Sequence, residues 1–197
     1  MKLQITTFIT FLLWSTLSSG SCVRAQGTQL LNQPKQMKKT PSSHTEVFTV
    51  KAPVGEVFDF IVAEDVLPKI LKKYLFIPAV TGTRVHAGDW KTPGSYRTVM
   101  FESGDTLREE LTHFEKPSYF GYTVSEFSSF QRHFASHGTG QWWFVAKGDL
   151  TEVKWTYTFY PKGTFGRMIL HPFVKNDFRT YMKRSIQLIQ SQIENGN

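Results

Sequence analysis

Residues 138–163 read GTGQWWFVAKGDLTEVKWTYTFYPKG, and this stretch decides the fold. Gly148-Asp149 separates two runs of aromatic and β-branched residues, which is the pattern of a β-hairpin with a two-residue turn. Such a turn sets the register and therefore the residues that lie opposite each other. One face of the hairpin is thus predicted to be a wall of aromatic side chains. The wall comprises Trp142 opposite Trp155, Phe144 opposite Val153 and, by alternation, Tyr157 and Phe159.

Turn signals divide the rest of the chain into further strands. Ser103-Gly104, Lys116-Pro117 and the loop DWKTPG at 89–94 are the clearest of these signals. Successive strands joined by short turns pair antiparallel. The predicted strands are 46–51, 80–85, 95–102, 106–114, 119–127, 141–147 and 151–160.

Three segments have helical periodicity instead. Apolar residues recur three or four apart after Pro53, again within 66–74, and in a tail of about 20 residues that ends near Asn195-Gly196. The apolar stripe of the tail comprises Phe178, Met182, Ile186, Ile189 and Ile193, and Pro172 is expected near the start of this helix. A sheet face must be covered, and this helix is the only predicted element long enough. We therefore predict an α+β fold: a curved antiparallel sheet of about seven strands, two short helices, and a long C-terminal helix across the sheet.

The N-terminus has the pattern of an export signal. Lys2 precedes an apolar run at residues 5–17 that is too short to span a bilayer, and cleavage is predicted after Ala25. An uncleaved membrane anchor and a lipid anchor at Cys22 are the alternatives. Residues 1–25 are thus predicted to be a signal peptide, 26–44 a flexible linker and 45–197 a ligand-binding domain in a periplasmic or extracellular protein.

Charge and cysteine content limit the classes of partner. The formal charge of +7 falls to about +5 without the signal, which does not indicate nucleic-acid binding. The predicted mature chain has no cysteine and hence no disulfide. Lys69, Lys72 and Lys73 form a basic run that either contacts anionic lipid or is simply a solvated surface. The oligomeric state is not predicted.

The turn at Ser103-Gly104 predicts a second cross-strand pair. If the turn has two residues, Arg97 lies opposite Glu110, beside Val99 and Phe101. An exposed pair would contribute at most about 1 kcal/mol. A buried pair beside apolar groups would instead orient the polar end of a ligand.

Other polar residues give weaker indications. His133 and His137 would bind metal together only on a helix, and Gly138 and Gly140 argue against a helix there. His113 could act as a base in a cavity, although a single histidine is more often structural. No metal site and no cofactor are predicted.

The chain from about 45 to 194 resembles the START-like, or SRPBCC, superfamily, which has the helix-grip fold of Bet v 1 relatives and bacterial polyketide cyclase/dehydrase-like proteins. The matching stretches are VFTVKAPVGEVFDFIV at 47–62, residues 88–124, and the hairpin above. The resemblance implies a deep cavity between the sheet and the C-terminal helix. It also implies ligands such as lipids, sterols, quinones, polyketides or aromatic compounds, and it transfers no catalytic residue.

These observations predict an exported binding or carrier protein for a small, largely apolar ligand. The alternative is a cyclase-, hydrolase- or isomerase-like enzyme, with Glu110 and His113 as its candidate catalytic residues beside Arg97. A third hypothesis is an interaction protein with a filled core. The predicted ligand-binding residues are Arg97, Val99, Phe101, Glu110, Trp142, Phe144, Val153, Trp155, Tyr157, Phe159 and Met182.

Overall fold

The structure is a computed structural model that describes residues 40–196. The predicted signal peptide, Cys22 and most of the predicted linker lie outside these residues. Within the described part of the chain, no helix is long and apolar enough to cross a membrane.

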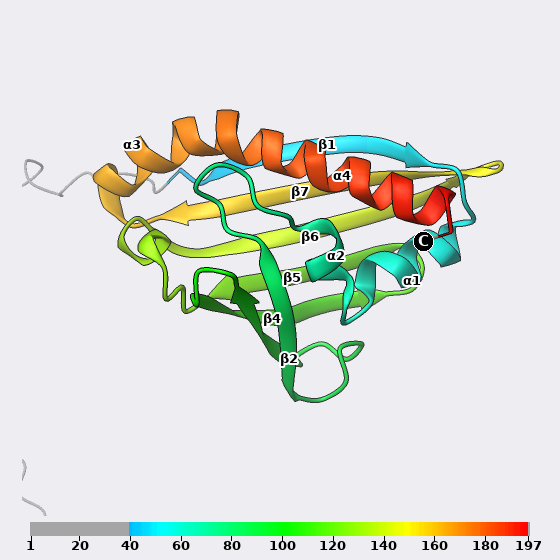
Figure 1. Cartoon of the computed structure of the whole chain (residues 1–197), viewed down its shortest axis with the longest axis horizontal. Coiled ribbons are helices and arrows are strands. Elements are labelled where there is room, and N and C mark those ends of the chain that lie inside the picture. Colours follow the sequence, from blue (N-terminus) through cyan, green and yellow to red (C-terminus); the bar gives the residue numbers. More distant parts are fainter. Residues whose placement is uncertain (1–39, 197) are drawn as a thin grey trace, which may run out of the picture. The chain divides into compact units, whose positions relative to one another are not determined.

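One antiparallel sheet of seven strands forms the body of the domain (Figure 1), in the order β1-β7-β6-β5-β4-β3-β2. The chain thus returns at β7 to pair with its first strand, while β2 lies at the opposite edge. The strands are β1 (Ser42–Val50), β2 (Val80–Ala87), β3 (Tyr96–Phe101), β4 (Thr106–Glu115), β5 (Tyr119–Ser125), β6 (Ala135–Lys147) and β7 (Leu150–Pro161).

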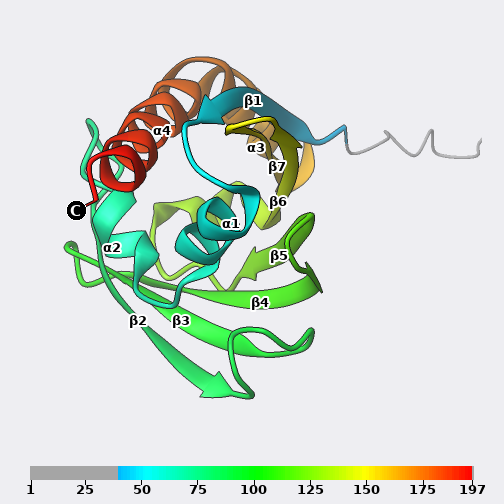
Figure 2. The ribbon, with the colours of Figure 1, turned by 90° about the vertical axis from the view of Figure 1, so that its right-hand side faces the viewer.

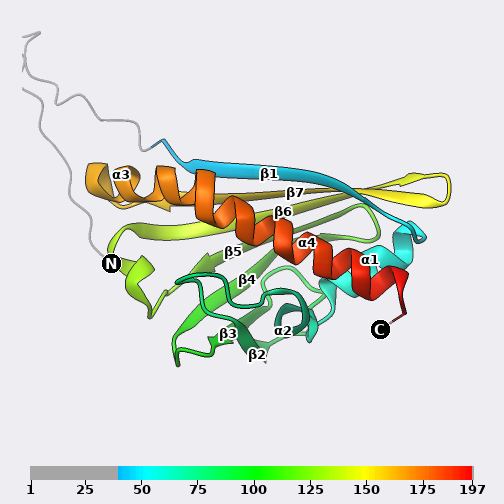
Figure 3. The same ribbon diagram turned by 45° about the horizontal axis from the view of Figure 1, so that its top comes forward.

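The helices all lie on the concave side of this sheet. Figure 2 shows the sheet curving around α1 (Val54–Val62), with α2 (Val66–Ile70) beside it. The C-terminal helix crosses the same side (Figure 3) as α3 (Gly163–Phe173), a π-helical turn η2 (Val174–Phe178) and α4 (Arg179–Glu194). A short 3₁₀ helix, η1 (Phe130–His133), precedes β6. This architecture confirms the predicted α+β helix-grip fold.

The hairpin of β6 and β7 has the predicted register. Trp142 lies opposite Trp155, and Phe144 lies opposite Val153. Gly148 has a φ of 62°, as a two-residue turn of this kind requires. The aromatic wall therefore faces the concave, helix-covered side of the sheet.

The predicted register of β3 with β4 was wrong by one residue. The turn has three residues rather than two, and Gly104 closes it with a φ of 82°. Arg97 consequently lies opposite Glu109, and Glu110 lies opposite Tyr96.

A β-bulge in β4 changes which of its side chains face the interior. Leu111 lies opposite Tyr122, yet His113 lies opposite Gly121, so Thr112 is an extra residue in the ladder. The bulge reverses the alternation beyond it. His113 is exposed in consequence, and Phe114 packs inward against Phe58.

Three element boundaries differ from the predictions. β1 begins at Ser42, so the last residues assigned to the linker belong to the sheet. β6 begins at Ala135, because the glycine-rich residues before 141 are extended. Helix α3 begins at Gly163, which places Pro172 inside the C-terminal helix rather than near its start.

Candidate functional site

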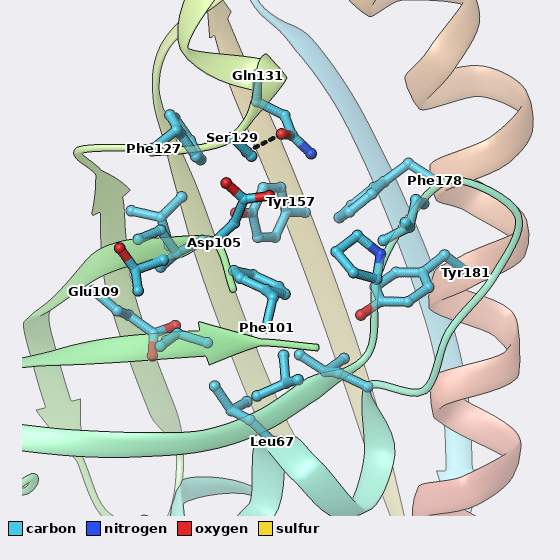
Figure 4. A pocket seen from close by; sticks show the side chains of 18 of the residues that line it. Leu67, Phe101, Asp105, Glu109, Phe127, Ser129, Gln131, Tyr157, Phe178 and Tyr181 are labelled. Carbon is cyan, nitrogen blue, oxygen red and sulfur yellow. Dashed lines mark hydrogen bonds between the residues drawn. The ribbon is translucent and has the colours of Figure 1, made fainter. Parts of the chain in front are cut away.

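A cavity of about 110 Å³ lies between the concave face of the sheet and the helices (Figure 4). Five strands (β2, β3, β4, β5 and β7) and the helices α2, α3, η2 and α4 contribute residues to its wall. Apolar and aromatic side chains predominate, as in typical ligand pockets. It shares Pro78, Asp105, Ser129, Gln131 and Phe173 with a wider surface hollow of about 820 Å³, so the hollow is its mouth. The inner lining includes Leu67, Leu71, Ile77, Val80, Val99, Phe101, Leu107, Glu109, Tyr122, Val124, Phe127, Trp155, Tyr157, Phe159, Phe178 and Tyr181.

The predicted aromatic wall divides between the cavity and a solid core. Trp155, Tyr157 and Phe159 line the cavity, as do Val99 and Phe101 from β3. The other predicted apolar residues, Trp142, Phe144, Val153 and Met182, are buried in the core and do not line it.

Helix α1 explains why that half of the wall is filled. Phe58 of α1 packs edge-on against Phe144, with ring centroids 5.1 Å apart. Trp142 lies beside Trp155 on the same face of the hairpin, and the two rings stack with their centroids 4.3 Å apart. The C-terminal helix is therefore not the only element that covers the sheet.

Arg97 forms a buried ion pair with a carboxylate of the cavity wall. Its Nε donates to Oε2 of Glu109 at 2.6 Å, and the side chains are only 2% and 4% exposed. The guanidinium also lies 3.9 Å from the ring centroid of Trp90, and Nη1 donates to the carbonyl oxygen of Glu64. Glu109 lines the cavity, whereas Arg97 does not. The pair thus presents its carboxylate, not its guanidinium, to the cavity.

Glu110 and His113 lie outside the cavity, contrary to the prediction. Glu110 accepts a hydrogen bond from Nη2 of Arg108 at 2.8 Å in a half-exposed pair. His113 packs against Tyr119, with ring centroids 5.6 Å apart. The three-residue turn and the bulge in β4 put both side chains on the opposite face from Glu109. The predicted cluster of Arg97, Glu110 and His113 therefore does not form.

Two glycines of β6 make room for tyrosines in the cavity wall. A Cβ at Gly140 would lie 2.2 Å from the ring of Tyr122, and one at Gly138 would lie 3.1 Å from the ring of Tyr157. Glycine is thus required at position 140 for the close approach of Tyr122 to the β6 backbone, and a side chain at position 138 would crowd Tyr157.

The cavity tyrosines are neutral hydrogen-bonding groups. Burial raises the pKa of Tyr122, Tyr157 and Tyr181 well above the ordinary value, and in Tyr122 the nearby charge of Glu109 adds to the effect of burial. Their hydroxyl groups therefore remain protonated at neutral pH.

Most of the lining residues were not among the predicted site residues. Tyr122 and Val124 could have been found, because they share one face of a predicted strand with Phe120. Phe178 was identified only as part of the helical stripe. No sequence signal connected the polar lining residues, because the cavity and its mouth bring together segments far apart in the sequence. These polar residues are Asp105, Glu109, Ser129 and Gln131.

Metal binding has no support in the described part of the chain. No group of three or more His, Cys, Asp or Glu side chains there could hold a metal ion. His137 lies in β6 and stacks on Tyr160 at 4.2 Å, while His133 lies in η1 beside Phe130.

Solved structures share this fold at low sequence identity. The crystal structure of Ara h 8.0201 is 20% identical, covers 77% of this chain and 99% of its own, and has a TM-score of 0.59. A point mutant of norcoclaurine synthase of Thalictrum flavum, in complex with a transition-state analogue, is 14% identical and has a TM-score of 0.61. The match covers 82% of this chain and 99% of that chain. The di-domain aromatase/cyclase BexL is 17% identical with a TM-score of 0.58, over 78% of this chain and 50% of its own.

A family model identifies the family of the protein, which structural similarity at such low sequence identity does not. No curated protein sequence matches the chain significantly. The family model described as "Polyketide cyclase / dehydrase and lipid transport", however, matches residues 42–194, from the first residue of β1 to the last of α4. The protein therefore belongs to the polyketide cyclase/dehydrase and lipid transport family, within the START-like, or SRPBCC, superfamily.

Proposed function

We propose that the protein is a binding or carrier protein for a small, largely apolar ligand held in the cavity between the sheet and the C-terminal helix. The observation that carries this proposal is the cavity itself, whose lining is mostly apolar and aromatic and which opens through one wide mouth. A dry apolar cavity of roughly 150 Å³ is enough to bind benzene in another protein. The inner cavity here, at about 110 Å³, is smaller, so it would hold only part of a ring system or a short chain, and the rest of the ligand would extend into the mouth.

The polar groups of the wall favour a ligand with one hydrogen-bonding end. Glu109 and the neutral hydroxyl groups of Tyr122, Tyr157 and Tyr181 line the cavity. A hydroxyl or carbonyl group on the ligand could exchange hydrogen bonds with these side chains.

Export is a separate part of the proposal and is based on residues 1–25 alone. The short apolar run after Lys2 and the Val23-Arg24-Ala25 sequence support a cleaved signal. Intact-mass measurement of the protein from cells that express the full chain would test it. A mass that begins at Gln26 supports export, and a mass that retains residue 1 contradicts it.

Ligand binding can be tested with a neutral fluorescent probe and a variant that fills the cavity. Val99 is 2% exposed and lines the cavity, so Val99→Phe should occupy part of its volume. We expect N-phenyl-1-naphthylamine to bind the natural chain and to bind Val99→Phe at least about tenfold more weakly, since roughly one ring's contact is lost. Native mass spectrometry of gently purified protein should also show a co-purifying small molecule.

Val145→Phe is the matched control, because Val145 is 48% exposed and lies outside the cavity. Probe binding that is equal in the natural chain and both variants would place the probe elsewhere. That result would remove the basis for the proposal.

The enzyme alternative lacks the residues on which it was based. Glu110 and His113 lie away from the cavity, and the carboxylates that line it are Asp105 and Glu109. Asp105 accepts hydrogen bonds from Ser103 and Ser128 at the mouth, and Glu109 is paired with Arg97. We therefore favour binding over catalysis.

A further inference from the structure

The mouth of the cavity is surrounded by apolar side chains that the fold leaves exposed. Eight large hydrophobic residues are exposed among residues 40–196, and five of them lie in segments that border the mouth. Contiguous exposed apolar groups of this kind mark interaction surfaces. We call these five residues the apolar rim: Leu75 (61% exposed), Phe76 (67%), Phe130 (74%), Phe165 (63%) and Met168 (62%).

The rim residues come from three segments that the fold holds together. Leu75, Phe76 and Phe130 line the mouth hollow, which also includes Ile169 and Phe173 of α3. The rings of Phe76 and Phe173 lie 5.9 Å apart. The loop before β2 and helix α3 thus meet at one side of the mouth.

Helix α3 adds Phe165 and Met168 to the same surface. On a helix, residues three and four apart are neighbours, so Phe165 lies beside both Met168 and Ile169, and Ile169 reaches the hollow. Close packing fixes the helix in place, because a Cβ at Gly166 would lie 2.3 Å from the carbonyl oxygen of Phe134. The backbone N–H of Lys162 donates to that same oxygen at 2.7 Å.

Basic residues accompany the apolar rim. Five lie within four sequence positions of a rim residue, and the only acidic residue within the same distance is Glu126. The carboxylates of the hollow come from the β3–β4 turn, where Glu102 pairs with Lys73 at 3.2 Å and Asp105 accepts from two serines. The five basic residues are Lys72, Lys73, Arg132, Lys162 and Arg167, and all of them are exposed.

We propose that the apolar rim docks on an anionic lipid membrane, with the mouth of the cavity against the bilayer. Exposed aromatic and aliphatic side chains insert at the headgroup level, and flanking lysine and arginine side chains are attracted to anionic lipids. A ligand could then pass between bilayer and cavity with little exposure to water. Membrane docking does not depend on the identity of the cavity ligand, so it can fail or succeed independently of the proposed function.

A site-specific fluorescent label tests the proposal with the full expressed chain. Phe130→Cys is labelled with an NBD maleimide in a Cys22→Ser background, and vesicles of phosphatidylcholine are compared with vesicles that contain 30% phosphatidylglycerol. We expect the NBD emission to shift to the blue and to increase severalfold with the anionic vesicles, and 0.5 M NaCl should reduce the response. The same label at Val145→Cys is the matched control and should not respond.

Replacing two aromatic residues of the apolar rim should weaken membrane binding without unfolding the domain. Phe76→Ser with Phe130→Ser should lower partitioning into the anionic vesicles by at least about tenfold, whereas Val47→Ser with Val145→Ser should leave it unchanged. The N-terminal residues are identical in all variants, so they cannot produce this difference. Circular dichroism spectra of all variants should match that of the natural chain, as a control for folding.

Three outcomes would overturn the proposal. The first is a rim label that does not respond to anionic vesicles, and the second is an equal response at Val145. The third is a blue shift that appears without lipid and grows with protein concentration, which would show that a second copy of the chain covers the rim.

Discussion

At the scale of single residues, Arg97 connects three segments of the chain. It pairs with Glu109 of β4, lies against Trp90 of the loop before β3, and reaches the carbonyl of Glu64 between α1 and α2. Two buried charges are expensive to remove from water, and the loss of one leaves the other without compensation. The loss of either partner should therefore destabilise the cavity wall strongly.

We expect Arg97→Met to lower the free energy of unfolding by about 3–5 kcal/mol, because Glu109 remains buried without its partner. Urea unfolding at pH 7 measures the change. The double variant Arg97→Met with Glu109→Leu should recover most of the loss, since no buried charge remains. A double variant that is as unstable as the single one would show that packing around Trp90, rather than the charge, dominates.

At the scale of elements, the C-terminal helix has a buried pattern that a regular helix cannot maintain. Gly166, Leu170, Val174, Phe178, Met182 and Ile186 are all buried and recur at every fourth position. With 3.6 residues per turn, each step of four drifts by about 40° around the axis. The π-helical turn η2 takes up one extra residue and thereby keeps both halves facing the sheet. Pro172, which lacks an N–H, lies just before this turn.

Deletion of Lys175, an exposed residue of η2, should therefore be tolerated. The π turn would become regular α-helix while α3 and α4 keep their buried faces, and we expect a change in unfolding free energy of less than about 1 kcal/mol. Thermal and urea unfolding provide the measurement.

Deletion of the exposed Lys183 in α4 is the matched control. It would rotate Ile186 and Ile189 away from the core by about 100°, at a cost of more than about 3 kcal/mol. Equal effects of the two deletions would contradict the role given to η2.

At the scale of the whole molecule, the buried tyrosines make stability dependent on alkaline pH. Burial raises the pKa of Tyr122, Tyr157 and Tyr181 in the folded state above the value in the unfolded chain. Below the unfolded pKa of about 10, both states are protonated and the full stability is present. At higher pH the unfolded state binds fewer protons than the folded one, so stability decreases as pH rises.

We expect the free energy of unfolding to fall above about pH 10 by up to about 1.4 kcal/mol per pH unit for each buried tyrosine. Urea titrations between pH 8 and 11.5 provide the values, and Tyr157→Phe should make the slope shallower. Tyrosinate absorbance near 295 nm offers an independent check. Ionisation of all seven tyrosines near pH 10 without unfolding would refute the prediction.

The parts of the fold that sequence could predict depend on short-range chemistry. Gly148-Asp149 allows one tight turn, so the pairing of Trp142 with Trp155 followed from the turn alone. The turn at Ser103-Gly104 did not fix the pairing of its strands in the same way, because Gly104 can close either a two-residue or a three-residue loop. That single ambiguity assigned the partner of Arg97 to Glu110 instead of Glu109. The bulge at Thr112 likewise had no local signal, and it alone moved His113 to the outside.

The sequence by itself determined the family, the strand and helix order, and which face of the β6–β7 hairpin is apolar, because periodicity and turn residues act over a few positions. Only the tertiary structure decided which aromatic side chains border empty space. That outcome depends on how far α1, the C-terminal helix and the curved sheet lie from one another. Phe58 packs against Phe144 where the sheet meets α1, and neither ring lines the cavity. Tyr157 and its neighbour Phe178 also pack together, yet both border empty space. This difference between distant packing partners is not encoded in any local pattern.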